Sequence, residues 1–437
     1  MSGNVKVRLL IALLVLSEIF YLLLFPAIGY PIIRYTSVAV VNSLLFILMV
    51  FLIRGTAATS KLAYTLIAVG ILFRITVLFF PPTASDDINR YIWDGKVQSA
   101  GINPYRYAPN DSALAGLHSQ LLPGSVNFPE MKSIYPPYAQ LIFFTSYNLF
   151  GESYTGFKIF LLVFEILTMI LLLMLLRRLK LPETYCGIYA LCPLPIMQFL
   201  IDGHVDGLGI PILVLTLLLF FQRKKIPFYV ALGLSISTKL ISGMILPFTA
   251  NELEKKNLRK ILAGMIPLVV FAVTYVPFFT KGVFPFESLM TFTANWTFNG
   301  SAFTAFYNII GDNQKARLLS ALLFLAYGSY LFFSRKEITV KIYSIFLAFF
   351  LLSPTVHPWY LAWLAVLLPM NFRWSGLAFI ASASLANYVV IDYKLKGIWQ
   401  MPGFIMLIEY LPVYILLIWE NIRDSRFLSL KRAHDSH

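Results

Sequence analysis

The residues with the clearest chemical potential are two adjacent carboxylates, Asp86 and Asp87, which follow an apolar run that ends at Pro82. Arg90 and Asp94 come next at four-residue spacing, and a helix would place both on the face of Asp86. A carboxylate near a bilayer surface is partly desolvated, and desolvation raises its pKa and its basicity. We therefore expect Asp86 or Asp87 to act as a general base that takes a proton from a hydroxyl group.

Two other interpretations of this pair stay open. Adjacent carboxylates are common in solvated turns and at helix caps, where they have no catalytic role. Their oxygens could also hold a divalent metal, although no second set of ligands is visible in the sequence. No motif for any other cofactor is present, so no cofactor is required by the sequence.

Three basic residues are candidates for binding a phosphate group: Arg90, Arg106 and Lys239. Arginine offers a planar fork of donors to a phosphate, whereas lysine offers a mobile point charge. Ion pairs with neighbouring carboxylates are the alternative for the two arginines. Lys239 interrupts an apolar stretch, where a charge is expensive and is therefore a functional candidate, unless its side chain extends to an interface.

Two further polar clusters could contribute to a substrate site. His204 and Asp206 belong to the sequence GHVDG, whose glycines allow a tight turn that exposes both side chains. His357 and Tyr360 belong to SPTVHPWY, where two prolines interrupt a helix. We expect these four residues, together with Asp94, to help bind substrate. A polar turn and an interfacial aromatic belt are the respective alternatives.

The segment 281–313 is expected to form a substrate-facing loop outside the membrane. It contains Trp296, Phe298 and Tyr307, whose ring faces could contact a sugar or an isoprenoid. Two matches to the N-glycosylation pattern in this segment are a weak signal.

The elements that must position these clusters are membrane helices. Of the 437 residues, 58% are hydrophobic and only 13% are charged, about half the charged fraction of a soluble domain. The net charge of +14 lies in short clusters between apolar runs, which fits a positive-inside bias and not nucleic-acid binding. The two cysteines, Cys186 and Cys192, are expected to be packing residues.

A spanning helix needs about 20 apolar residues, and this criterion predicts an all-α, polytopic helical bundle of about twelve spans in a single domain, 1–437. The spans are expected near residues 9–25, 37–53, 62–80, 156–176, 185–201, 208–222, 260–279, 315–333, 338–352, 359–370 with its flanks, 374–391 and 401–420. The first is expected to remain uncleaved.

Two apolar segments are expected not to span the membrane. Residues 136–150 are short and predict a half-inserted or interfacial helix, and 227–249, flanked by basic clusters, predict a hairpin entering from the cytoplasm. With both termini cytoplasmic, 81–135 becomes a helical extracytoplasmic loop that carries the catalytic pair. Four polar or aromatic clusters then fall on the extracytoplasmic side: Asp86-Asp87, 202–207, 281–313 and 353–360. The topology itself is assigned from lysines and arginines elsewhere in the chain.

The residues that follow the apolar run also carry a resemblance. The sequence SDDxxRYxWDGxVQxxGxNPYxYAP, from Ser85 to Pro109, resembles polyprenol-phosphate-sugar-dependent glycosyltransferases of the GT-C superfamily, and most of all their bacterial α-mannosyltransferase branch. Further matches in family order are YPPYAQ (135–140), DGHVDGLGIP (202–211), STKL (237–240) and SPTVHPWY (353–360).

This resemblance implies a GT-C-like fold in a bacterial inner membrane and an inverting transfer of a hexose, mannose by resemblance. The donor would be a polyprenyl-phosphate-linked sugar and the acceptor a glycan or a lipid-linked glycan on the extracytoplasmic face. An acidic residue of the first large external loop would be the base, which favours Asp86, while Arg90 and Lys239 would hold the donor phosphate. The chain departs from many relatives in having two spans before the acidic loop and no large C-terminal soluble domain.

Two other functions fit the same composition. A flippase or transporter of lipid-linked sugars should show repeat symmetry and ionisable residues at mid-membrane, whereas here no clear repeat is visible and the polar residues gather at one face. A glycan ligase or polymerase would use a diphosphate-linked donor.

Overall fold

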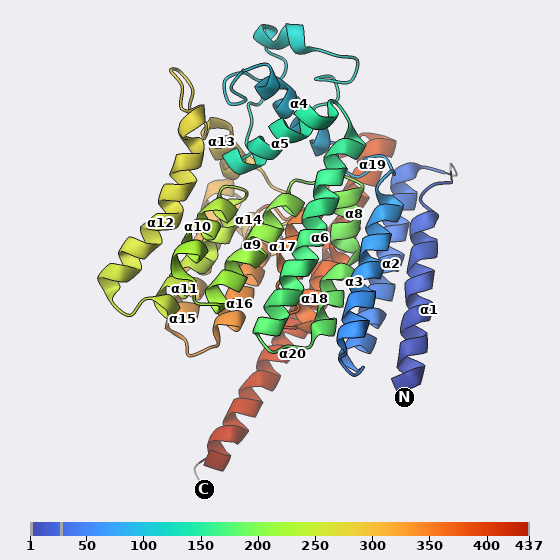
Figure 1. Ribbon diagram of the computed structural model, residues 1–437, viewed down its shortest axis with the longest axis vertical. Coiled ribbons are helices and arrows are strands. Elements are labelled where there is room, and N and C mark those ends of the chain that lie inside the picture. Colours follow the sequence, from blue (N-terminus) through green and yellow to red (C-terminus); the bar gives the residue numbers. More distant parts are fainter. Residues whose placement is uncertain (1–2, 27–28, 436–437) are drawn as a thin grey trace.

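The computed structural model describes residues 3–26 and 29–435, with side chains described as far as residue 424. The described residues contain helices and no β-strand, so the predicted all-α class is confirmed. The helices form a bundle, and the start of α1 (Gly3–Leu22) and the end of α20 (Gly403–Asp435) lie at the same end of it (Figure 1).

Among the described residues, seven helical segments are long and apolar enough to cross a membrane. They are α2 (Pro31–Arg54), α3 (Ser60–Val77), α6 (Tyr154–Arg178), α12 with the turn that follows it (Asn257–Phe278), α15 (Asn313–Phe333), α18 through α19 (Trp374–Lys396) and α20 as far as Asp424. Three shorter apolar helices accompany them: α9 (Asp206–Phe221), α10 (Lys225–Ile236) and α16 (Ile338–Leu352). The chain is therefore an integral membrane protein.

Two of the predicted spans are wrong as continuous helices. The segment 185–201 is divided into α7 (Cys186–Ala190) and α8 (Pro193–Leu200), and 359–370 consists of the short helix α17 (Ala362–Ala365) between tight turns. Every residue of 186–204 and of 361–370 is buried. Irregular backbone is tolerated at membrane depth only where protein surrounds it, and these two segments meet that condition.

The segment 136–150 behaves as predicted for a helix that does not span the bundle. It forms α5 (Pro137–Phe150), which lies with α4 (Asp87–Ser99) across one end of the bundle (Figure 1). The two helices share an apolar core in which the rings of Tyr91 and Phe143 stack with centroids 4.8 Å apart. This core holds α4, and with it the carboxylate pair at its start, over the bundle.

The segment 227–249 forms the expected hairpin. Helix α10 runs toward α4, the chain turns at 237–239, and the short helices η3 (Leu240–Ile245) and α11 (Leu246–Leu253) return. Lys239 stands at the turn, in extended backbone. The hairpin therefore carries this lysine into the interior of the protein.

The segment 281–313 contains α13 (Glu287–Asn295) and α14 (Ser301–Ile310). Between them, Phe298 pairs with the loop after α16 through a bond from its amide to the Pro354 carbonyl at 2.9 Å. Asn299 adopts a left-handed φ of 52° and donates to both carboxylate oxygens of Glu409, at 3.1 and 3.0 Å. The buried side chain of Asn299 is therefore not presented for glycosylation.

Candidate active site

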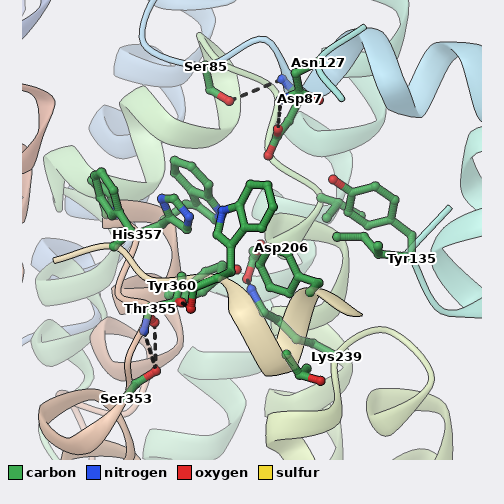
Figure 2. Close-up of a pocket in the computed structure, with 18 of the residues that line it drawn as sticks. Ser85, Asp87, Asn127, Tyr135, Asp206, Lys239, Ser353, Thr355, His357 and Tyr360 are labelled. Carbon is green, nitrogen blue, oxygen red and sulfur yellow. Dashed lines mark hydrogen bonds and ion pairs between the residues drawn. The ribbon is translucent and has the colours of Figure 1, made fainter. Parts of the chain in front are cut away.

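A cavity of about 1400 Å³ lies between α4 and the bundle, and each of the four polar clusters contributes to its wall. Figure 2 shows side chains from these clusters pointing into a common space, with Asp87 and Asn127 across from Asp206 and Lys239. The residues of the predicted site that line the cavity are Asp86, Asp87, Arg90, Asp206, Lys239, His357 and Tyr360.

The carboxylates of Asp86 and Asp87 are held together by one amide. The Nδ2 atom of Asn127 donates to an oxygen of each carboxylate, at 2.9 Å in both cases. Asp86 is the residue before α4 and faces the open cavity, whereas Asp87 lies in the first turn of the helix. The positive end of the helix dipole and Asn127 thus allow two negative charges to sit side by side.

Both carboxylates are more basic than usual. Burial raises the pKa of Asp87 to about 6, against the hydrogen bond from Asn127, which lowers it. The surrounding protein also desolvates Asp86 and raises its pKa, while Asn127 and the charge of Lys394 act in the opposite direction. A carboxylate with a raised pKa is a stronger base, which suits removal of a proton from a hydroxyl.

The chain that leads into the pair is fixed by Asp202. Its Oδ1 atom accepts hydrogen bonds from the backbone amides of Thr83 and Ala84, both at 2.8 Å, and its Oδ2 atom accepts from the hydroxyl of Tyr35 at 2.6 Å. Gly203 follows with φ +77°, and a Cβ there would lie 2.5 Å from the Cδ1 atom of Ile88. Glycine is therefore required for the DGHVDG turn to approach α4.

Two lysines from distant helices hold the same segment. Lys158 of α6 donates to the carbonyl of Phe80, and Lys394 of α19 (Tyr388–Lys396) donates to the carbonyl of Thr83, each at 2.6 Å. The position of the carboxylate pair is thus defined by the turn that carries Asp202 and by α6 and α19, and not by its own loop alone.

The opposite side of the cavity is built around Asp206 and Lys239. The ammonium group of Lys239 pairs with the Oδ1 atom of Asp206, which also accepts from the indole N–H of Trp363 at 2.6 Å. The Nζ atom of Lys239 lies 3.5 Å from the centroid of the Tyr360 ring. Lys239 is thus a cation held at the cavity surface by a carboxylate and an aromatic face.

The two histidines form part of a stack of rings. His204 stacks on Trp359 with centroids 3.6 Å apart, Trp359 stacks on His357 at 4.3 Å, and His357 stacks on Phe298 at 4.4 Å. His357 lines the cavity, and burial lowers its pKa to about 3, so its imidazole is neutral. His204 is fully buried behind the wall, with its Nδ1 atom 3.6 Å from Asp87 Oδ2.

Three further residues were predicted to bind substrate. Arg90 is paired with Asp94 at 2.8 Å and with the Met131 carbonyl at 2.8 Å, so it reaches the cavity as a bonded group. Asp94 does not line the cavity and accepts from Ser133 at 2.5 Å as well. Arg106 is exposed away from the cavity, over the ring of Tyr107. The ion-pair alternative therefore describes Arg90, and Arg106 is not brought to the other clusters.

One arm of the cavity is apolar. It continues from Lys239 between η3, α15 and α16, and its lining residues are Leu240, Ile241, Met244, Ala321, Phe324, Phe349 and Phe350. Trp296 and Phe298 line the cavity as the sequence predicted, whereas Tyr307 does not. The cavity therefore combines a polar centre with a wall suited to hydrocarbon.

Several residues of this site were not found from the sequence. Asn127 lies in a loop without any recognisable signal, and its contact to Asp86 spans 41 residues. Lys394 did have a signal, because it stands with Lys396 at the predicted external end of a span, where a positive-inside bias expects few lysines. Asp202 was part of a recognised motif, but its role as an anchor depends on a contact to Thr83 across 119 residues.

Few side chains of the site are placed to bind a metal ion. Across residues 3–26 and 29–424, no group of three or more His, Cys, Asp and Glu side chains is placed to hold a metal ion. The group that faces both carboxylates is the amide nitrogen of Asn127, which donates a hydrogen bond to each of them. A metal at Asp86 and Asp87 stays a prediction that a chelator can test.

Comparison with protein families gives one match. Residues 19–253 match the model described as alpha-(1->6)-mannopyranosyltransferase, N-terminal domain. The matched region includes α2 to α11, and therefore Asp86, Asp87, Asp206 and Lys239. Comparison with curated proteins gives no match.

Proposed function

Since the chain belongs to the alpha-(1->6)-mannopyranosyltransferase family, we propose that it transfers mannose from a polyprenyl-phosphate-linked donor to a glycan or lipid-linked acceptor. The reaction takes place on the extracytoplasmic face of a bacterial inner membrane. One observation carries this proposal: a single cavity holds a basic carboxylate pair, a cation across from it, and an apolar arm that leads away from the cation.

The apolar arm accounts for a lipid-linked donor. Its phenylalanine and aliphatic side chains begin next to Lys239, so a phosphate bound at the lysine leaves the attached isoprenoid chain beside Phe324 and Phe349. A nucleotide-sugar would instead place a polar base and ribose against these apolar side chains. This supports a donor in which hydrocarbon follows directly on the phosphate.

The chemistry follows from the opposed positions of base and cation. Asp86 takes the proton of the acceptor hydroxyl, the acceptor oxygen forms a bond to the anomeric carbon, and the bond from that carbon to the phosphate oxygen breaks. Polyprenyl phosphate leaves with its negative charge stabilised by Lys239. A base on one side of the sugar and a leaving group on the other suit a single displacement with inversion, as expected of a GT-C enzyme.

The test is transfer by purified protein in detergent from labelled polyprenyl-phosphate-mannose to a membrane glycan extract. Asp86→Asn should fold normally and lose about 10²- to 10⁴-fold in rate. Asp111→Asn is the matched control, because Asp111 only accepts a bond from the Ala113 amide at 2.9 Å, which asparagine can also accept. Full activity of Asp86→Asn would mean that Asp87 or another residue is the base.

Three further arms of the assay separate the alternatives. Transfer from a diphosphate-linked oligosaccharide, and not from the monophosphate donor, would assign the chain to the ligases or polymerases. Translocation of the labelled lipid across vesicles without a new glycosidic bond would assign it to the flippases. Loss of transfer in a chelator, restored by a divalent cation, would show that Asp86 and Asp87 hold a metal.

A further inference from the structure

The cavity has a second arm, on the side of Asp86, that lies outside the family-matched residues 19–253. Its wall comes from the end of η6 (Ala383–Asn387), from α19 and from the loop that follows, through Asn387, Val390, Tyr393, Lys394 and Trp399. This arm differs from the lipid arm in chemistry, because it combines exposed aromatic rings with polar groups.

The two aromatic rings of this arm are unusually accessible. Tyr393 is 53% and Trp399 is 54% exposed, although both line the cavity. Their rings are nearly perpendicular, with centroids 5.5 Å apart, and so form two sides of a corner. Exposed aromatic faces that border a pocket bind ligands with an apolar face and polar edges, which is the character of a pyranose ring.

A buried donor in the same wall is unused. The Nδ2 atom of Asn387 has no hydrogen-bond partner, although the residue is only 4% exposed and lines the cavity. A buried donor left unpaired is destabilising, so such groups normally have a hydrogen-bond partner. An acceptor oxygen from a ligand in this arm would satisfy it.

The carboxylates divide between the two arms. Lys394 is the cation whose charge acts on Asp86, whereas Asp206 and Lys239 act on Asp87. Lys394 contacts the Thr83 carbonyl at 2.6 Å, which leaves its other N–H groups available beside Asp86. A ligand in this arm therefore meets Asp86 on the side away from Lys239.

We propose that Asn387, Tyr393, Lys394 and Trp399 form the acceptor subsite, which binds the mannopyranose ring whose hydroxyl is deprotonated at Asp86. The ring stacks in the corner of Tyr393 and Trp399, and its oxygens accept from Asn387 and Lys394. This inference rests on the proposed function, since it names where the acceptor of that reaction binds.

The decisive variant is Trp399→Ala, with Trp419→Ala as its control. Trp419 is 47% exposed on α20 and does not line the cavity, so it matches the size and exposure of Trp399 without its position. With an α-(1→6)-linked mannotriose acceptor, Trp399→Ala should raise the acceptor KM at least tenfold, with kcat and donor KM within twofold of wild type. A donor KM that rises instead, or an acceptor KM that does not change, would overturn the subsite.

A second measurement does not depend on the donor. Saturation-transfer NMR on the detergent-solubilised protein with mannotriose alone should show signals from the sugar that Trp399→Ala abolishes and Trp419→Ala retains. If wild type binds the trisaccharide but transfers no mannose to it from the polyprenyl-phosphate donor, the proposed function fails while the subsite stands. If neither wild type nor the variants bind it, the subsite fails whichever donor is used.

Discussion

The helices behind the carboxylate pair, α2 and α6, and the helices α12 and α15 are all apolar enough to cross a membrane but pack very differently. In the most apolar stretches of α2 and α6, 56% and 50% of the residues are buried, against 11% in α12 and 17% in α15. Helix α12 stands at the edge of the bundle in Figure 1. The first pair belongs to a well-packed frame behind the carboxylates. Helix α15, whose Ala321 and Phe324 line the cavity, is a thin wall between the cavity and the outside of the bundle.

Buried polar contacts hold the frame together. Arg74 of α3 and Glu165 of α6 are fully buried and form an ion pair at 2.8 Å, and Arg74 also donates to the carbonyl of Ala190 at 2.6 Å. Tyr189 donates to Glu165 at 2.6 Å. These bonds tie the end of the broken helix α7 to its neighbours, and the described part of α12 has no comparable buried pair. The difference fits the proposed donor, whose hydrocarbon chain would lie on the α15 side of the cavity, opposite the frame that holds the carboxylate pair.

The largest effect should come from breaking the frame. Glu165→Gln leaves the fully buried guanidinium of Arg74 without its counter-charge, which should lower the free energy of unfolding by about 3–5 kcal/mol. Glu254→Gln is the control, since Glu254 pairs with a Lys225 side chain that is 47% exposed, and should cost no more than about 1 kcal/mol. Thermal unfolding in detergent compares them, and equal shifts of Tm would remove the contrast between frame and periphery.

The next effect concerns pH. A base must be ionised, and burial raises the pKa of Asp86, the proposed base, above its usual range and raises the pKa of its neighbour Asp87 to about 6. The rate should therefore begin to fall at a higher pH than an ordinary aspartate would require, by about tenfold for each pH unit below the pKa of the base. His357 at the cavity and His204 behind its wall stay neutral over this range, because burial lowers the pKa of both.

Two variants show which wall sets this pH dependence. Asp202→Asn weakens the anchor of the segment before Asp86, and a more solvated pair should move the inflection of the pH–rate profile down toward 4. Phe324→Ala, in the thin wall, should leave the inflection at its wild-type position. An inflection that moves equally in both variants would mean that the frame does not control the basicity of the pair.

The smallest effect should come from the thin wall itself. Phe324→Ala removes apolar surface from the lipid arm and should raise the KM for a long-chain donor about three- to tenfold. A donor with a chain too short to reach Phe324 should be unaffected. Leu322→Ala serves as the control, because Leu322 is 54% exposed on the same helix and does not line the cavity. Equal KM values for the two donor lengths in Phe324→Ala would place the lipid elsewhere.

Much of the fold could be read from local features. Apolar runs predicted the long helices, and the short length of 136–150 and the basic flanks of 227–249 separated the two elements that do not cross the bundle. The prediction failed at 185–201 and 359–370, because hydropathy measures how apolar a segment is and not what surrounds it. Both segments are enclosed by protein, so their backbones need not complete a helix.

The sequence by itself determined that this chain is a helical membrane protein and which residue types, the carboxylate pair and Lys239 among them, are costly enough to need a role. Only the tertiary structure decided which partner each charge has and which charges reach the cavity. Arg90 is paired with Asp94 and Lys239 with Asp206, and both line the cavity, whose other arm is lined by Lys394. The reason is physical: the partner of a charge is chosen by proximity in space, and the bond from Lys394 to Thr83 joins residues 311 positions apart.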